Sequence, residues 1–157
     1  LNGRVLAGGL GLVAACDLVY AADHAEFGLP EVKVGVFPAM VAAKLLAKIP
    51  LGRLQEMAYL GHTVSASEAT RLGLINRAVP LASLDGLIEE VLATLRHNAP
   101  GAIAAGKAAL LAMRDMPSAE RLVFAERIIA VVSGSDEARE GRLAFAEKRP
   151  PRWTGKP

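Results

Sequence analysis

The hydrophobic residues in the first part of the chain fall into short blocks separated by glycine or polar residues. Residues 4–7, 18–22 and 26–28 are expected to form short strands, because Val, Leu, Tyr and Phe are favoured there. Residues 8–15 begin with two glycines, which predicts a turn that opens into a short helix. Strand, helix and strand in quick succession indicate an α/β region.

From residue 39 the hydrophobic residues recur at helical spacing. Ser65 and Glu68 form a capping box, which predicts a helix that ends at Gly73. Residues 74–79 predict a strand, and the chain beyond Pro80 is expected to be helical. The other helices are expected at residues 39–48, 52–60, 84–97, 101–113, 119–132 (after a Ser118 cap) and 136–148. The predicted organisation is an α/β part over residues 1–80 and a helical part over residues 81–157.

The last two expected helices are apolar around much of their circumference. We expect one face to pack against another subunit; the alternative is burial within the same chain. The apolar residues concerned are Leu122, Val123, Phe124, Ile128, Ile129, Val131, Val132, Leu143 and Phe145.

Composition narrows the possible classes of function. The chain has 157 residues, of which 52% are hydrophobic, but its apolar runs are far shorter than the roughly 20 residues of a membrane span. A soluble globular protein without a membrane partner is expected. The net charge of +2 is interspersed and aromatic residues make up only 4%, which argues against a nucleic-acid partner.

The cysteine and histidine residues suggest no metal or disulfide chemistry. The single cysteine, Cys16, lies in an apolar stretch and is expected to be a buried, inert thiol, which fits a reducing compartment and a cytoplasmic location. His24, His62 and His97 are far apart and have no metal-ligand spacing. Because the chain opens directly on a strand pattern without Met, we expect it to be the interior of a longer polypeptide. Whether that polypeptide carries a targeting segment for an organelle stays open.

Gly8 and Gly9 lie between an expected strand and an expected helix. A helix N-terminus has free N–H groups and partial positive charge, and glycine lets a ligand oxygen approach closely. Such donors stabilise a developing oxyanion by about 3–4 kcal/mol each. Alternatively, the glycines serve only tight packing between strand and helix.

Residues 9–14 also fit the dinucleotide-binding pattern G-x-G-x-x-A, with Glu31 lying 20 residues after Gly11. The context disfavours this interpretation. Only about six helical residues precede Cys16, too few for a normal crossover helix, and Glu31 follows Pro30 in a turn-like setting.

Glu31 follows a Gly-Leu-Pro turn and precedes Val32, Val34 and Val36. A carboxylate among apolar neighbours is suited to proton transfer. The alternative is an exposed loop carboxylate or an ion pair with Lys33 or a remote base.

The chain resembles the crotonase (enoyl-CoA hydratase/isomerase) superfamily along its whole length, in order and with family spacing. The segments that carry the resemblance are Asn2-Gly3, Gly8-Gly9, Cys16-Asp17, Phe27-Gly28-Leu29-Pro30-Glu31, Gly35-Val36-Phe37-Pro38, residues 63–69, residues 73–80 and residues 140–149.

The resemblance implies a spiral of ββα units followed by C-terminal helices that mediate assembly into a homotrimer or hexamer. It implies acyl-CoA substrates, with CoA as part of the substrate and no separate cofactor. One donor of the family's oxyanion hole falls at Gly8, and the other belongs upstream of Leu1, so the chain resembles the C-terminal portion of a family member.

The resemblance also assigns candidate site residues. Glu31 matches one of the two glutamates that hydratases use, whereas the other falls at Gly11. Lys148 matches a position that can reach the nucleotide end of CoA across a subunit boundary. Residues 39–43 replace a glycine-rich stretch of the family, so we expect a reshaped acyl pocket.

Two functions follow from this resemblance. One carboxylate and an oxyanion hole suffice for double-bond isomerisation, whereas Gly11 disfavours the standard two-glutamate hydratase reaction. The alternative is a non-catalytic acyl-CoA-binding or assembly subunit. With half of the oxyanion hole, this chain alone is expected to show little catalysis.

Overall fold

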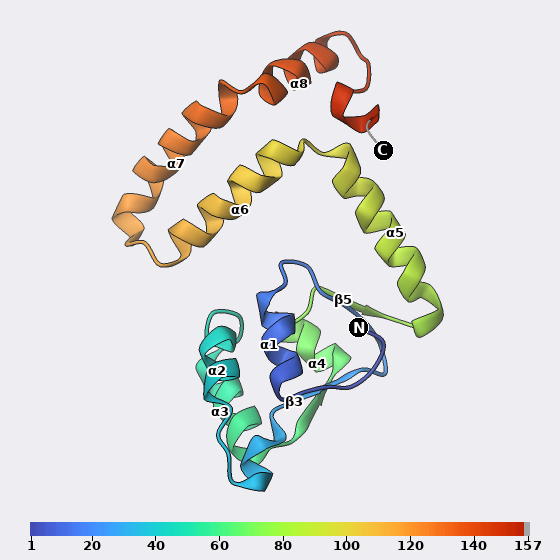
Figure 1. Ribbon diagram of the computed structural model, residues 1–157, viewed down its shortest axis with the longest axis vertical. Coiled ribbons are helices and arrows are strands. Elements are labelled where there is room, and N and C mark those ends of the chain that lie inside the picture. The colour runs from blue at the N-terminus through green and yellow to red at the C-terminus, as the bar shows by residue number, and fades with distance from the viewer. Residues whose placement is uncertain (156–157) are drawn as a thin grey trace. The chain divides into compact units, whose positions relative to one another are not determined.

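The computed structural model describes residues 1–155 and contains two compact units, Leu1–Ile88 and Glu89–Pro157 (Figure 1). The first unit is α/β and the second is helical, as the hydrophobic pattern predicts. The division between the two units falls within a single helix, α5 (Leu81–His97). The functional division expected between residues 80 and 81 falls at the start of that helix and stays a prediction.

The strands of the first unit form two small sheets. The first sheet has the order β1-β3-β4, with β1 parallel and β4 antiparallel to the central strand; Val5 pairs with Phe27, and Phe27 with Val64. In the second sheet β2 and β5 run parallel. The strands are β1 (Val5–Leu6), β2 (Tyr20–Ala22), β3 (Glu26–Gly28), β4 (Thr63–Ser65) and β5 (Arg77–Val79).

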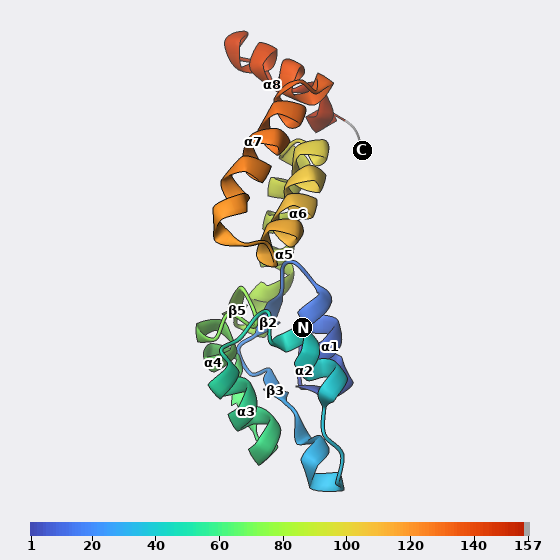
Figure 2. The same ribbon diagram turned by 90° about the vertical axis from the view of Figure 1, so that its left-hand side faces the viewer.

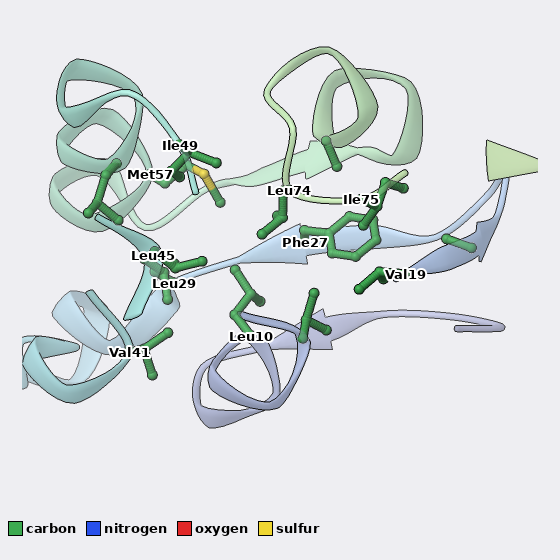
Figure 3. Packing of buried hydrophobic residues seen from close by; sticks show 14 of the residues in the cluster. Leu10, Val19, Phe27, Leu29, Val41, Leu45, Ile49, Met57, Leu74 and Ile75 are labelled. Carbon is green, nitrogen blue, oxygen red and sulfur yellow. The ribbon is translucent and has the colours of Figure 1, made fainter. Parts of the chain in front are cut away.

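Helices cover these sheets and enclose one core. Phe27, on the central strand, is fully buried together with Leu10, Leu29, Leu45, Met57 and Leu74 (Figure 3). The first two helices pack side by side, as Figure 2 also shows. The helices are α1 (Gly8–Ala15), α2 (Ala39–Leu45), α3 (Leu51–Leu60) and α4 (Ala66–Arg71).

The predicted cap at Ser65 is confirmed, but the capping box is only half formed. Ser65 Oγ accepts a hydrogen bond of 3.2 Å from the Glu68 N–H at the start of α4. The Glu68 carboxylate instead pairs with Arg53, at 3.2 Å, and with Arg71. The sequence prediction missed β4 itself, because a strand of three residues that leads directly into a helix cap shows no alternation.

The prediction that Cys16 is buried is wrong. Cys16 follows the last residue of α1 and is exposed. The apolar stretch around it is a short helix with only one buried face, carrying Leu10 and Val13, whereas Leu12 is 75% exposed. Apolar composition alone did not indicate which face was buried.

The described residues of the second unit contain the rest of α5, three further α-helices and the 3₁₀ helix η2 (Arg152–Gly155); α6 and α7 pack against one another. Ser118 is the first helical residue of α7 and not its cap, since Pro117 occupies that position. Ser135 does cap α8, accepting a 3.1 Å hydrogen bond from the Ala138 N–H. The helices are α6 (Pro100–Arg114), α7 (Ser118–Ser133) and α8 (Asp136–Ala146).

Helix α8 ends two residues before the expected position, and an ion-pair cluster follows it. Lys148 adopts a positive φ of 53°, which a continuing helix does not allow. Glu140 accepts from Arg149 at 2.6 Å and from the Arg152 N–H at 2.9 Å. The hydrogen bond from Arg149 is the main reason that the pKa of Glu140 falls to about 2, and the same bond raises the pKa of Arg149.

The helices of the second unit expose many large apolar side chains. Leu122, Ile129 and Val131 on α7 are 64–74% exposed, and Phe145 on α8 is 88% exposed. Among residues 89–155, Ala109 and Ala144 are the buried hydrophobic residues. Within the described residues of its own unit, α7 is therefore not buried, and its packing against another subunit stays a prediction.

None of the helices in residues 1–155 combines the length and hydrophobicity needed to cross a membrane. Within the same residues, no three His, Cys, Asp or Glu side chains are grouped as metal ligands would be.

Candidate active site

The turn between β1 and α1 brings the helix N-terminus to the edge of the first sheet. Ala7 has a φ of 51°, unusual for a residue with a side chain, and its N–H donates a 3.0 Å hydrogen bond to the carbonyl of Gly28 on β3. Gly8 then begins α1. The first N–H groups of a helix have no acceptor within the helix, so this end of α1 can bind a negatively charged oxygen.

The two glycines at this turn have different roles. A Cβ atom at Gly9 would lie 3.3 Å from Val5 Cγ1, which is a tight contact, whereas one at Gly8 would meet nothing within 4 Å. The packing interpretation therefore applies to Gly9. At Gly8 the space beside the backbone is open, as an approaching ligand requires.

The dinucleotide-binding alternative does not fit this topology. The strands that flank α1 belong to different sheets, since β1 pairs with β3 whereas β2 pairs with β5. A Rossmann unit needs both strands side by side in one parallel sheet.

Glu31 lies on a short 3₁₀ helix, η1 (Pro30–Val34), which follows directly on β3 and the buried Leu29. Gly35 ends η1 with a left-handed φ of 77°, and Val36 donates a 3.1 Å hydrogen bond to the carbonyl of Glu31. These contacts hold the backbone of Glu31 rigidly, so the carboxylate is not on an open loop.

The Glu31 carboxylate has one buried oxygen, Oε2, without a hydrogen-bond partner among residues 1–155. The ion pair with Lys33, one alternative from the sequence, is absent from that part of the chain. Burying an unpaired polar atom costs about 1–3 kcal/mol. Such an atom in a native structure needs an explanation, and a hydrogen bond to a proton of a bound ligand would supply one.

Gly8, Gly11 and Glu31 line one pocket of about 520 Å³, although they come from different elements. The structure therefore brings together the helix N-terminus, the candidate carboxylate and Gly11, the position at which the resemblance predicts a second carboxylate. The rest of the lining is mainly apolar and comes from Val36, Phe37, Pro38, Ala39, Met40, Val41 and Lys44.

A Cβ atom at Gly11 would not clash with the pocket wall. A Cβ atom there would lie 3.7 Å from Val41 Cγ2, an ordinary contact distance across the packed helices α1 and α2. The missing second carboxylate is thus not excluded by crowding at this position.

Lys148 belongs to the second unit, where it follows α8 and donates its N–H to the Phe145 carbonyl at 3.2 Å. Its expected contact with CoA stays a prediction. Sequence reasoning missed Lys44, which lines the pocket. The sequence feature that could have identified Lys44 is the helical spacing of residues 40, 41 and 44. This spacing places all three residues on one side of α2.

A family model described as enoyl-CoA hydratase/isomerase matches residues 1–156. The carnitinyl-CoA dehydratases of Salmonella arizonae and Escherichia coli K12 are each 38% identical to the chain. The alignments cover 99% of this chain but only 61% and 62% of those proteins. The chain thus spans about three fifths of the length of these curated relatives.

Solved structures show the same fold. An enoyl-CoA hydratase from Mycobacterium smegmatis superposes with a TM-score of 0.92 at 33% identity, over 98% of this chain and 60% of that one. An enoyl-CoA hydratase/isomerase from Marinobacter aquaeolei gives 0.90 at 34% identity, over 97% and 58%. The predicted crotonase-like α/β fold is confirmed, and the chain belongs to the enoyl-CoA hydratase/isomerase family.

Proposed function

We propose that this protein acts on an acyl-CoA thioester, with Glu31 moving a proton beside the thioester carbonyl and the Gly8 N–H stabilising the carbonyl oxygen. The observation that carries this proposal is the buried, unpartnered Oε2 of Glu31 in the pocket that Gly8 also lines. CoA enters as part of the substrate, and the chemistry needs no further cofactor.

The proposed reaction moves a double bond without net gain or loss of atoms. The Glu31 carboxylate removes a proton from the α-carbon of a 3-enoyl thioester, and the electron pair delocalises onto the thioester oxygen. The Gly8 N–H stabilises that negative charge as it forms. The protonated Glu31 then returns the proton to the γ-carbon, and the double bond comes to lie between the α- and β-carbons.

Isomerisation suits this pocket better than hydration. Adding or removing water needs a group that handles the water proton as well as one for the α-proton. Glu31 is the carboxylate among the residues that line the pocket, and Gly11 has no side chain. The carnitinyl-CoA dehydratases are named for the loss of water, so we infer that this chain differs from them in reaction.

The test is double-bond isomerisation of a 3-enoyl-CoA in deuterated water by the full-length protein. Glu31→Gln keeps the size of the side chain but removes the base, so we expect turnover and deuterium uptake to fall about 10²–10⁴-fold. Glu26→Gln is the matched control, because Glu26 pairs with Arg4 and does not line the pocket. Equal rates for the Glu31 variant and the control would refute the role of Glu31.

A non-catalytic acyl-CoA-binding or assembly subunit is the second candidate, and Gly11 favours it. This alternative predicts measurable affinity for acyl-CoA thioesters with no turnover of any of them. It also predicts that Glu31→Gln changes affinity only modestly. Any turnover that depends on Glu31 would exclude it.

We also propose that the protein assembles into a homotrimer or hexamer, and that Lys148 contacts the nucleotide end of CoA. The exposed apolar residues of α7 and α8 support assembly, because monomers rarely leave so many such residues open to water. The free thiol of Cys16 supports a cytoplasmic, reducing location.

A further inference from the structure

Lys44 is the second charged residue of the pocket, besides Glu31. We propose that Lys44 selects acyl chains whose far end carries a carboxylate, so that the pocket takes dicarboxylic acyl thioesters. This inference rests on the proposed function, since it names the substrate class of the same site.

The position of Lys44 follows from the face that α2 presents. Val41 lies across from Gly11, where a Cβ atom would be 3.7 Å from its Cγ2, and Met40, Val41 and Lys44 share one side of the helix. Lys44 lies five residues after Ala39, which is about 7–8 Å along the helix axis. The lining residues between Ala39 and Lys44, which are Met40 and Val41, are apolar and suit the methylene groups of an acyl chain.

The charge of Lys44 is not neutralised within the part of the chain that the structure describes. Its ammonium group forms no ion pair or hydrogen bond with residues 1–155. By contrast, the neighbouring Lys48 donates a 2.7 Å hydrogen bond to the Cys16 carbonyl. Lys44 is an exposed residue, so its unpaired ammonium favours an anionic group with the modest strength of a solvent-exposed pair.

The same arrangement disfavours a positively charged acyl chain. A carnitinyl group carries a quaternary ammonium, which Lys44 would repel. Quaternary ammonium groups are usually held by several aromatic side chains, and Phe37 is the aromatic residue in this lining. We therefore infer a substrate class different from the one in the relatives' name.

Binding of saturated thioesters tests Lys44 independently of catalysis. The pairs hexanoyl-CoA with adipoyl-CoA and octanoyl-CoA with suberoyl-CoA differ only in the terminal methyl or carboxylate, and trimethylammoniobutanoyl-CoA supplies the cationic end. Calorimetry should show the carboxylate form binding about two- to fivefold more tightly at one or both lengths. The cationic form should bind most weakly.

Two variants separate Lys44 from general charge effects. Lys44→Met should abolish the preference for the carboxylate, measured as the ratio of the affinities for the carboxylate-ended and methyl-ended chains of equal length. Lys33→Met is the matched control, because Lys33 lies on η1 near Glu31 but does not line the pocket. It should keep the preference.

Equal affinities for both chain ends, or no binding of either, would overturn the inference, as would a preference that survives in Lys44→Met. The two proposals fail separately. A retained tail preference without turnover would refute only the isomerase reaction, whereas turnover without a tail preference would refute only the role of Lys44.

Discussion

The two units of this chain bury their hydrophobic residues very differently. The unit Leu1–Ile88 has a core around Phe27, with further side chains that are fully shielded from solvent. The unit Glu89–Pro157 buries Ala109 and Ala144 among its described residues and exposes the large side chains of α7. The comparison teaches that the unit with its own core holds the pocket lined by Glu31, whereas the helical unit leaves large apolar side chains exposed, which supports the proposed assembly.

Removing the central side chain of the first core tests this contrast most strongly. Phe27→Ala should lower the free energy of unfolding by about 3–5 kcal/mol, because it leaves a cavity between β3 and its neighbours. Leu110→Ala on α6 is the control in the other unit and should cost under about 0.5 kcal/mol, since Leu110 is 68% exposed. Urea denaturation of both variants measures the difference, and similar losses would break the comparison.

A second carboxylate at Gly11 should change the reaction of the first unit. Gly11→Glu is expected to raise hydration of a 2-enoyl-CoA by at least about tenfold, because the added side chain can activate water opposite Glu31. A Cβ atom at this position would make an ordinary contact with Val41 Cγ2 at 3.7 Å. Gly11→Gln, which is neutral and of equal size, should gain nothing. If both variants hydrate equally, the gain comes from shape and not from acid–base chemistry.

A charge in the apolar surface of α7 should weaken assembly. Val131→Glu places a carboxylate at a residue that is 74% exposed, and we expect self-association to weaken by about tenfold or more. Ser133→Glu adds the same charge at a polar position of the same helix and should have little effect. Sedimentation velocity distinguishes them, and a wild-type protein that stays monomeric at high concentration would contradict the proposal of assembly.

The ion pairs after α8 should make the second unit acid-sensitive. The pKa of Glu140 is held at about 2, below its ordinary 4.5, mainly by its hydrogen bond with Arg149. Because the folded pKa is lowered, the stabilisation is complete above about pH 4.5 and is lost as the pH falls toward 2. Glu140→Gln should flatten the stability profile in this window, as followed by circular dichroism. An unchanged profile would show that the pairing contributes nothing.

Much of the fold could be predicted from the sequence because its local signals agree with one another. Residues 8–15 form the expected helix, since two glycines follow a strand and an apolar block follows them. Ser65 caps a helix as its spacing indicates. The burial of Cys16 was mispredicted and β4 was missed, because burial and pairing depend on which distant segments a short stretch meets.

The site was predictable only as separate residues. Gly8, Gly11 and Glu31 could be singled out by local context and by resemblance, but the pocket that joins them exists only once α2 has packed against α1 and η1 against α3. Lys44 shows the limit most clearly. A lysine near the end of a helix is usually a solvated residue, and only its place in the lining suggests a role.

The central claim is that Glu31 removes a proton from the α-carbon of an acyl-CoA thioester. The most direct measurement is exchange of the α-protons of a saturated acyl-CoA into deuterated water, followed by NMR. We predict exchange with the wild-type protein and with Glu26→Gln, and a loss of at least about 10²-fold with Glu31→Gln. Exchange that continues at the wild-type rate in Glu31→Gln would contradict the account.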